Sequence, residues 1–171
     1  MIRYAFLLLA LVSCSNAAAT KPAGGVVVKL GDATVFELGP PETPAMKLHA
    51  DGTTEFLEHY RHKAPDWKPG FTLAADGSVG FGGKRLGTLA EEFNGVASGH
   101  DHTSKKLDGN AVVIDIQGLP TARFELADDQ TVTLTGRPAA DVKRWRIDAR
   151  DKDVARTAFL VFAVWMKSSI D

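Results

Sequence analysis

The chain has 171 residues, of which 44% are hydrophobic and 24% charged, a composition that predicts one folded domain and excludes a wholly disordered protein. Its 20 basic and 21 acidic residues give a formal net charge of −1, so the sequence carries no electrostatic footprint for a nucleic-acid partner. The single cysteine, Cys14, excludes an internal disulfide framework and any zinc or iron–sulfur site built from several cysteines.

The first 13 residues have the pattern of a cleaved leader. Residues 1–4 supply a short positive region, and the apolar run 5–12 has about the length of a signal-peptide core. A transmembrane helix needs about 20 apolar residues, so this run is too short to span a bilayer. We expect the leader to be removed from the mature protein.

Residues 11–14, Leu-Val-Ser-Cys, resemble the lipobox of bacterial lipoproteins. The resemblance implies cleavage before Cys14, a diacylglyceryl group on its sulfur and a further acyl chain, such as palmitate, on its amine. Each buried methylene contributes about 0.8 kcal/mol, so two or three chains hold a protein at a membrane in practice permanently. The alternative is an ordinary secretory cut within Ala17-Ala18-Ala19, which would remove the cysteine and leave a soluble secreted or periplasmic protein. We favour lipidation, because the only cysteine falls at the one position that the lipobox needs.

The leader and its cysteine divide the chain into three parts: a signal peptide at 1–13, a lipid-anchored flexible tether at 14–25 and a single β-rich domain at 26–171. The tether is small, polar and rich in Ala and Gly, without hydrophobic periodicity. Ser15 follows the cysteine, and by resemblance to the enterobacterial sorting rule, in which Asp at this place retains a lipoprotein at the inner membrane, we expect the outer membrane. The partners implied are the membrane, through lipidated Cys14, and a protein of the envelope.

From Val26 onward, short apolar or alternating runs separated by turn residues predict antiparallel β-structure. The runs 26–30 and 34–38 flank Gly31-Asp32, which predicts a hairpin with a tight turn. The proline-rich residues 39–44 should interrupt the ladder, because proline donates no backbone hydrogen bond.

A weak internal repeat predicts a series of hairpins. Residues 47–56 align with residues 72–81, and residues 125–134 form a third, decayed copy. The shared frame is Leu, two residues, Asp-Gly or its substitute, a hydroxyl residue and an apolar residue three further on. Asp-Gly is typical of a type I′ turn, in which both central residues need positive φ. We expect each copy to be one hairpin, and consecutive copies to pack into a curved sheet or open barrel.

Three further strands are predicted in the second half of the chain. Asp108-Gly109 indicates a turn that leads into a strand at 111–116, and a second strand follows at 123–126. Residues 144–148 alternate cleanly, which predicts a last strand with Trp145 and Ile147 on the core or partner side.

Two segments have helical character. Residues 86–93 predict a short helical turn, weakened by nearby glycines, and residues 153–168 predict a short C-terminal helix that is apolar nearly all round. Such a helix is expected to be either a buried plug across the sheet or a contact with a partner. A buried strand is the alternative for residues 158–166, given their β-branched and aromatic content.

Together these features resemble a group of bacterial lipoproteins without assigned activity, of the kind abundant in myxobacteria. They combine a lipobox leader, repeated Leu-x-x-Asp-Gly-Thr-x-x-x-Phe hairpins and a short apolar C-terminal segment, here residues 154–166. The resemblance implies a mainly β fold, and it carries over no catalytic residue and no cofactor.

Histidines are the first candidates for chemistry. His100 and His102 would share one face of an extended strand, and His59 and His62 would share one face of a helical turn. Two imidazoles on one face can ligate a metal, but the sequence assigns no third or fourth ligand. A polar loop with histidines is the alternative that we favour.

Acidic residues offer no recognised site. Asp148, Asp151 and Asp153 lack the glycine and terminal glutamate of a calcium loop, so a solvated turn before a helix is expected. Glu91 and Glu92 are adjacent and therefore point apart. No nucleophile elbow, phosphate loop or dinucleotide fingerprint occurs in the sequence.

Three functions are compatible with these patterns. The first is a lipid-anchored, non-enzymatic envelope module that acts through interactions. The second is a metal-binding or hydrolytic periplasmic enzyme that uses the histidine pairs. The third is a carrier of a small apolar ligand, held in a cavity inside the curved sheet, for which a filled interior would be contrary evidence.

Overall fold

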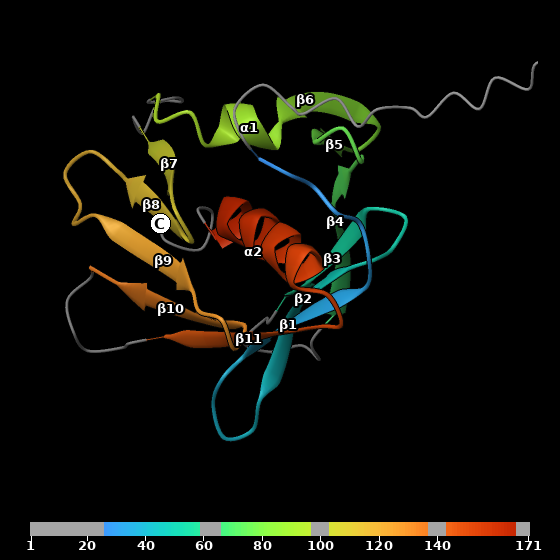
Figure 1. Ribbon diagram of the computed structural model, residues 1–171, viewed down its shortest axis with the longest axis horizontal. Coiled ribbons are helices and arrows are strands. Elements are labelled where there is room, and N and C mark those ends of the chain that lie inside the picture. Colours follow the sequence, from blue (N-terminus) through green and yellow to red (C-terminus); the bar gives the residue numbers. More distant parts are fainter. Residues whose placement is uncertain (1–25, 59–65, 97–102, 137–142, 167–171) are drawn as a thin grey trace, which may run out of the picture.

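The structure, a computed structural model, describes residues 26–58, 66–96, 103–136 and 143–166. These residues form one curved, unclosed sheet of eleven antiparallel strands, wrapped around a C-terminal helix (Figure 1). The expected fold class, mainly β with hairpin repeats and a short C-terminal apolar helix, is confirmed.

In chain order the strands are β1 (Ala33–Glu37), β2 (Thr43–Leu48), β3 (Thr53–Glu58), β4 (Asp66–Leu73), β5 (Ser78–Phe81), β6 (Lys84–Thr88), β7 (Ser104–Asp108), β8 (Ala111–Asp115), β9 (Ala122–Leu126), β10 (Thr131–Thr135) and β11 (Arg144–Ala149). Within the described ranges there are two helices, α1 (Leu89–Glu92) between β6 and β7 and α2 (Lys152–Met166) after β11.

The sheet consists of two wings that meet at the strands nearest the chain ends. Its order is β6-β5-β4-β3-β2-β1-β11-β10-β9-β8-β7, so β1 and β11 are neighbours at the centre. They pair antiparallel from Ala33 opposite Ala149 to Glu37 opposite Trp145. Each wing is a meander of consecutive hairpins, and the two edge strands, β6 and β7, come from the middle of the chain.

Helix α1 bridges the gap between these two edges (Figure 1). It begins with a capping box, in which Thr88 Oγ1 accepts from the Glu91 N–H and the Glu91 carboxylate accepts from the Thr88 N–H. After the helix, Asn94 forms an isolated antiparallel bridge with Lys106 of β7. The sheet itself stays open, and α1 spans its opening.

Helix α2 fills the space that the sheet encloses. Ten of its 15 residues are buried, including Ala158, Phe162 and Ala163, each with 0% of its surface exposed. A helix that is surrounded by sheet on most sides has to be apolar on most sides, which explains the composition of the segment. Residues 158–166 are thus helical, and the expectation of a buried plug is confirmed.

A chain of aromatic rings joins the two wings through α2. Phe162 lies 5.3 Å from Trp145 of β11, and Trp165 stacks on Phe56 of β3 at 4.5 Å between ring centroids. The full series of ring contacts runs Phe124, Trp145, Phe162, Trp165, Phe56, Phe71, Phe81. Because side chains of α2 occupy the interior, the space that a carrier of apolar ligands would use is filled.

All three sequence repeats form the same hairpin turn. In the first, the His49 N–H donates to Thr53 O, the Gly52 N–H donates to His49 O, and Asp51 Oδ1 accepts from the Thr53 N–H. The turns 74–78 and 127–131 repeat this pattern, with Asp76 and Asp129 as the acceptors. The three copies are therefore structural repeats.

The predicted turn type is wrong in detail. Each turn has three loop residues, and positive φ occurs only at the third, at +84° for Gly52, +83° for Gly77 and +66° for Gln130. A type I turn followed by a left-handed residue fits this pattern, whereas a type I′ turn would need positive φ at Asp as well. The Asp carboxylate instead accepts the backbone N–H two residues ahead, which stabilises the turn.

The predicted hairpin around Gly31-Asp32 is also wrong. Residues 26–32 form no strand, and β1 pairs with β2 and β11. The segment instead packs against α2, where Val26 is buried in the main core and the Lys29 N–H donates to Thr157 Oγ1 at 3.0 Å. A run of β-branched residues is compatible with either packing, and the distant helix provides the better apolar surface.

The remaining predicted elements are confirmed with shifted bounds. Residues 39–42 interrupt the ladder, which resumes in β2 at Thr43. The expected helix at 86–93 is shorter, because residues up to Thr88 belong to β6. Trp145 and Ile147 face the core, each with 2% of its surface exposed, as the alternation of β11 predicted.

Candidate functional site

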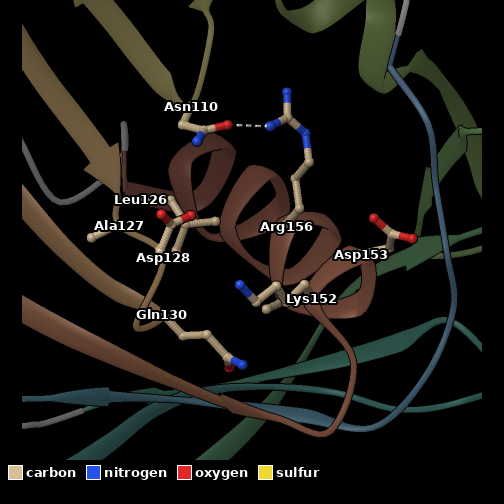
Figure 2. A pocket seen from close by; sticks show the side chains of 9 residues that line it. Asn110, Leu126, Ala127, Asp128, Gln130, Lys152, Asp153 and Arg156 are labelled. Carbon is tan, nitrogen blue, oxygen red and sulfur yellow. Dashed lines mark hydrogen bonds between the residues drawn. The ribbon is translucent and has the colours of Figure 1, made fainter.

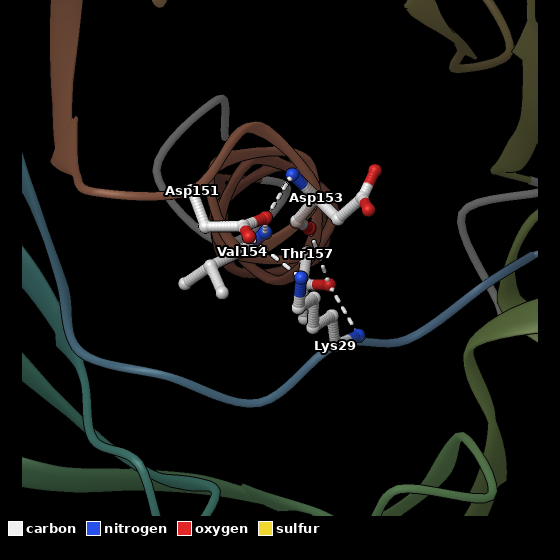
Figure 3. A network of polar contacts seen from close by, with 5 residues as sticks. All are labelled: Lys29, Asp151, Asp153, Val154 and Thr157. Atoms are coloured by element: carbon white, nitrogen blue, oxygen red, sulfur yellow. Dashed lines mark hydrogen bonds and ion pairs between the residues drawn. The ribbon is translucent and has the colours of Figure 1, made fainter.

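The segment that leads into the domain is fastened to the beginning of α2 (Figure 3). Lys29 Nζ donates to Asp151 Oδ2 at 2.6 Å, and the Lys29 N–H donates to the buried hydroxyl of Thr157. Thr157 in turn donates to Asp153 O at 3.0 Å. We call these four residues, Lys29, Asp151, Asp153 and Thr157, the tether joint.

Asp151 has two roles in the tether joint. Its Oδ1 accepts from the N–H groups of Asp153 at 2.8 Å and Val154 at 3.4 Å, so it caps the N-terminus of α2. The hydrogen bond from Lys29, together with these backbone bonds, holds the pKa of the Asp151 carboxyl below its usual value. The same contact raises the pKa of Lys29. The charged forms of both groups are thus favoured in the fold.

Close packing holds the backbone of this segment against α2. A Cβ on Gly31 would stand 2.8 Å from a methyl group of Val154, a separation that the existing packing does not allow. The two polar links of Lys29 and this steric contact act at neighbouring positions of one short segment. Residues 26–31 are therefore held by contacts with the central helix and not by strand pairing.

A pocket of about 180 Å³ lies beside the first turns of α2 (Figure 2). Arg156 donates to Asn110 Oδ1 at 2.7 Å and to Gly109 O at 3.1 Å, and Gln130 Nε2 donates to Ala149 O at 3.2 Å. Arg156 thus ties α2 to the β7–β8 turn, and Gln130 ties the β9–β10 turn to the end of β11. Their donors are engaged within the protein, which is typical of a structural joint.

A larger, more open groove of about 460 Å³ runs beside β4, β5 and β6. Its lining includes Thr72, Ser78, Gly80, Lys84 and Arg85. A Cβ on Gly80 would stand 2.7 Å from Thr72 Oγ1, so the glycine leaves room for the Thr72 side chain on the neighbouring strand. Neither the Lys84 nor the Arg85 side chain forms a hydrogen bond or a close ion pair with a described residue, so two exposed cationic side chains lie at the free edge of the sheet.

The four histidines that the sequence offers as metal ligands stay candidates. His59, His62, His100 and His102 all lie outside the described residues. His49 is described, and its Nε2 lies 3.2 Å from Glu55 Oε2 near the first repeat turn. In the described ranges no group of three or more His, Cys, Asp or Glu side chains could hold a metal ion.

The acidic candidates have structural roles. Asp151 is the helix cap, as expected for a turn before a helix. Glu91 belongs to the capping box of α1, whereas Glu92 accepts from Lys105 Nζ of β7 at 2.5 Å. The Lys105 side chain is only 8% exposed, so this ion pair forms a largely buried link between α1 and β7.

The sequence predicts a turn before the helix that contains Asp148, Asp151 and Asp153, but it does not single out Asp151 as the cap, and it gives no sign of the roles of Lys29, Thr157 and Lys105. A local pattern of Asp before an apolar helix indicates a cap. The partners of the missed residues are remote, since Lys29 and Thr157 are 128 positions apart in the chain. No local signal marks such a pair.

Cys14 also lies outside the described residues, so its lipidation stays a prediction. Neither α1 nor α2 has the length and apolar character that crossing a membrane would require. Comparison of the chain with protein-family models, with curated proteins and with solved structures gave no match.

Proposed function

We propose that the protein is a lipid-anchored module of the bacterial cell envelope, attached to the outer membrane through Cys14. The module acts by binding other envelope components and not by catalysis. The observation that carries the proposal is the position of the only cysteine, which ends an apolar leader at the place that a lipobox requires. Two or three acyl chains there would supply stable membrane attachment without a transmembrane segment.

The tether joint supports this proposal. A protein held at a membrane experiences load where its tether enters the fold. Here the entering segment is bound to the central helix α2 through Lys29, Asp151 and Thr157. Load applied at Val26 would therefore reach the middle of the core instead of peeling a strand from the edge of the sheet.

The filled interior is the second supporting feature. Because α2 occupies the volume inside the sheet, contacts with other molecules have to be made by the surface. The grooves beside β4–β6 and at the beginning of α2 are open surface features of this kind. A module that presents a surface from a lipid anchor matches this arrangement better than an apolar carrier does.

The proposal is tested by the fate of the amino terminus. Mass spectrometry of the mature protein should find Cys14 as the first residue, carrying acyl groups. Cys14→Ser should move the protein from the membrane fraction to the soluble fraction, whereas the matched control Ser15→Ala should stay in the membrane. An unmodified terminus after Ala19, or unchanged fractionation of Cys14→Ser, would contradict the proposal.

The destination has its own test. Ser15→Asp, expressed in an enterobacterial host, should shift the protein from the outer to the inner membrane, with Ser15→Ala as the control. Equal distribution of the two variants would contradict the outer-membrane assignment while leaving lipid attachment intact.

A further inference from the structure

Large apolar side chains on the described surface gather near the place where the tether joins the domain. Val27, Phe81, Leu86 and Val96 are between 52% and 66% exposed. Single exposed apolar residues are common on proteins and need no explanation. Four of the five most exposed large ones share one region here, and the fifth, Leu119, lies in the β8–β9 connection.

Several contacts place these residues along one edge of the sheet. Residues 26–32 lie beside the β4–β5 turn, since a Cβ on Gly77 would stand 3.7 Å from a methyl group of Val28. The same turn accepts the Leu89 N–H of α1 at Gly77 O, at 2.9 Å. Phe81 pairs with Lys84 at the opposite end of the β5–β6 hairpin, the length of β5 away from that turn. Leu86 precedes α1 and Val96 follows it, and Figure 1 shows β5, β6, α1 and the start of segment 26–32 along one side of the molecule.

Cationic side chains lie among these apolar ones. Lys84 and Arg85 are adjacent to Leu86 on β6, and Lys106 of β7 lies beside Gly95, whose Cβ would stand 3.9 Å from the Lys106 Cβ. None of the three side chains forms a hydrogen bond or a close ion pair within the described residues, although Arg85 and Lys106 each lie near a carboxylate, Asp76 and Asp108, whose charge they help to stabilise. Carboxylates also lie in this region: Glu91 caps α1, Glu92 pairs with Lys105, and Asp76 accepts from the Ser78 N–H, and of these three Glu92 is the one balanced by an ion pair within the described residues. We call this surface, Val27, Phe81, Lys84, Arg85, Leu86, Val96 and Lys106, the α1 rim.

We propose that the α1 rim lies against a lipid surface with anionic headgroups. Apolar side chains that project from a cationic surface are typical of proteins that rest in the membrane interface. Exposed lysine and arginine groups attract anionic lipids within a Debye length of the surface.

The tether favours the membrane as the occupant. This inference rests on the proposed function, in which Cys14 is lipidated and only residues 15–25 separate it from Val26. Eleven linker residues span about 5–6 Å times the square root of their number, which keeps the domain within a few tens of ångström of the bilayer. Val27, a member of the rim, is next to the end of that tether. Val27 is thus the rim residue that the anchor holds nearest to the lipid along the chain.

The single cysteine makes a site-specific test possible. The full-length, lipidated Leu86→Cys variant is reconstituted in vesicles that contain phosphatidylglycerol. In this variant the lipid blocks the Cys14 sulfur, so the thiol at position 86 is the only reactive one. The emission maximum of an environment-sensitive fluorophore at position 86 should shift to shorter wavelength. Spin-labelled lipid should quench this fluorophore several-fold more than the same fluorophore attached to the Leu119→Cys variant. Val96→Cys provides a second rim position, in case the first variant is perturbed.

Charge is tested by a paired variant. The double substitution Lys84→Glu and Arg85→Glu should reduce the quenching of a fluorophore at position 96 on anionic vesicles. A protein with the original Lys84 and Arg85 should show a similar reduction when phosphatidylcholine vesicles replace the anionic ones. Both residues are exposed, so folding should not be affected.

The outcomes separate the two proposals. If the protein fails to float with vesicles, the lipid anchor itself is wrong. If it floats and the probes at 86, 96 and 119 respond equally, the anchor stands and the rim is overturned. Protection of position 86 in native membrane fragments but not in protein-free vesicles of the same lipids would assign the rim to a protein and would also overturn the proposal.

Discussion

At the scale of single residues, one loop position controls each repeat turn. Gly52, Gly77 and Gln130 all have φ between +66° and +84°, a conformation that costs most residues about 1–2 kcal/mol. Gln130, the one non-glycine residue with positive φ in the described chain, donates from its side chain to Ala149 O. That hydrogen bond offsets part of its backbone strain.

The two glycines are expected to differ in their tolerance of a side chain. A Cβ on Gly52 would stand 1.9 Å from Leu73 O, whereas a Cβ on Gly77 would meet only a methyl group at 3.7 Å. Gly77→Ala should therefore lower the free energy of unfolding by the conformational cost alone, about 1–2 kcal/mol. Gly52→Ala should cost clearly more, because β4 has to move. Urea denaturation of both variants checks this, and equal losses would contradict the proposed close approach.

The aspartates of the repeat turns predict acid sensitivity. Hydrogen bonds from Thr53, Ser78 and Thr131 hold the pKa values of Asp51, Asp76 and Asp129 below the ordinary 3.8. Because each pKa is depressed in the folded state, the stabilisation is present above the unfolded pKa and is lost as the pH falls through the folded one. The urea midpoint should decline between about pH 5 and pH 2.

A matched variant isolates this contribution. Replacing the three aspartates by asparagine keeps an oxygen acceptor for each backbone N–H and removes the titrating group. The triple variant should be less stable near neutral pH and should show a shallower decline in acid. A decline as steep as in the parent protein would assign the acid sensitivity to other carboxylates.

At the scale of elements, the short helix α1 holds the two edges of the sheet at a fixed distance. Exposed edge strands are prone to pair with other chains, and charged residues together with bulges are the usual protection. Strand β6 carries Lys84 and Arg85. Its pairing with β5 also has a register shift, between Val79 and Gly80 of β5. Strand β7 is partly covered by the Asn94 bridge and by the Lys105–Glu92 ion pair.

Removal of each partner of this ion pair should have unequal effects. Glu92→Ala leaves the ammonium group of Lys105 buried and unpaired, which should cost about 1.5–3 kcal/mol, the value of a hydrogen bond to a charged group. Lys105→Met leaves Glu92, whose side chain is 38% exposed, to be solvated by water, so a smaller loss is expected. Chemical denaturation of both variants measures the difference, and an equal or larger loss for Lys105→Met would contradict it.

Elements with local signals could be predicted from the sequence, and elements that depend on remote partners could not. The alternation in β11 placed Trp145 and Ile147 correctly, and the repeat frame located three hairpins. The run 26–30 has the composition of a strand, yet it is held by Thr157, 128 positions away from Lys29. The same limit applies to the α1 rim, whose members become neighbours only through the sheet order.

At the scale of the molecule, α2 is the element that both wings share. Phe162 contacts Trp145 of one wing, and Trp165 of the same helix stacks on Phe56 of the other. Neither wing can bury its inner face without this helix, because each is a single curved layer. The wings should therefore unfold together in one transition.

Truncation of the central ring tests this dependence. Phe162→Ala removes a side chain with no exposed surface and should lower the free energy of unfolding by about 3–5 kcal/mol, a large share of the about 5–15 kcal/mol typical of a domain. The half-buried Phe36, which lies under Arg146 on the outer surface, is the control, and Phe36→Ala should cost less. Two separate transitions in either protein would contradict the shared core.

The position of α2 also has a consequence for the order of events during synthesis and export. The central strand β1 pairs with β11, and both wings pack on α2, yet β11 and α2 are the last described elements to be made. Until they emerge, the preceding strands are exposed hairpins without a core, and contacts so distant in sequence form slowly. If the protein is exported as proposed, its nascent chain would thus stay extended enough to be threaded through a translocation channel, and folding would be completed on the far side, once α2 has crossed.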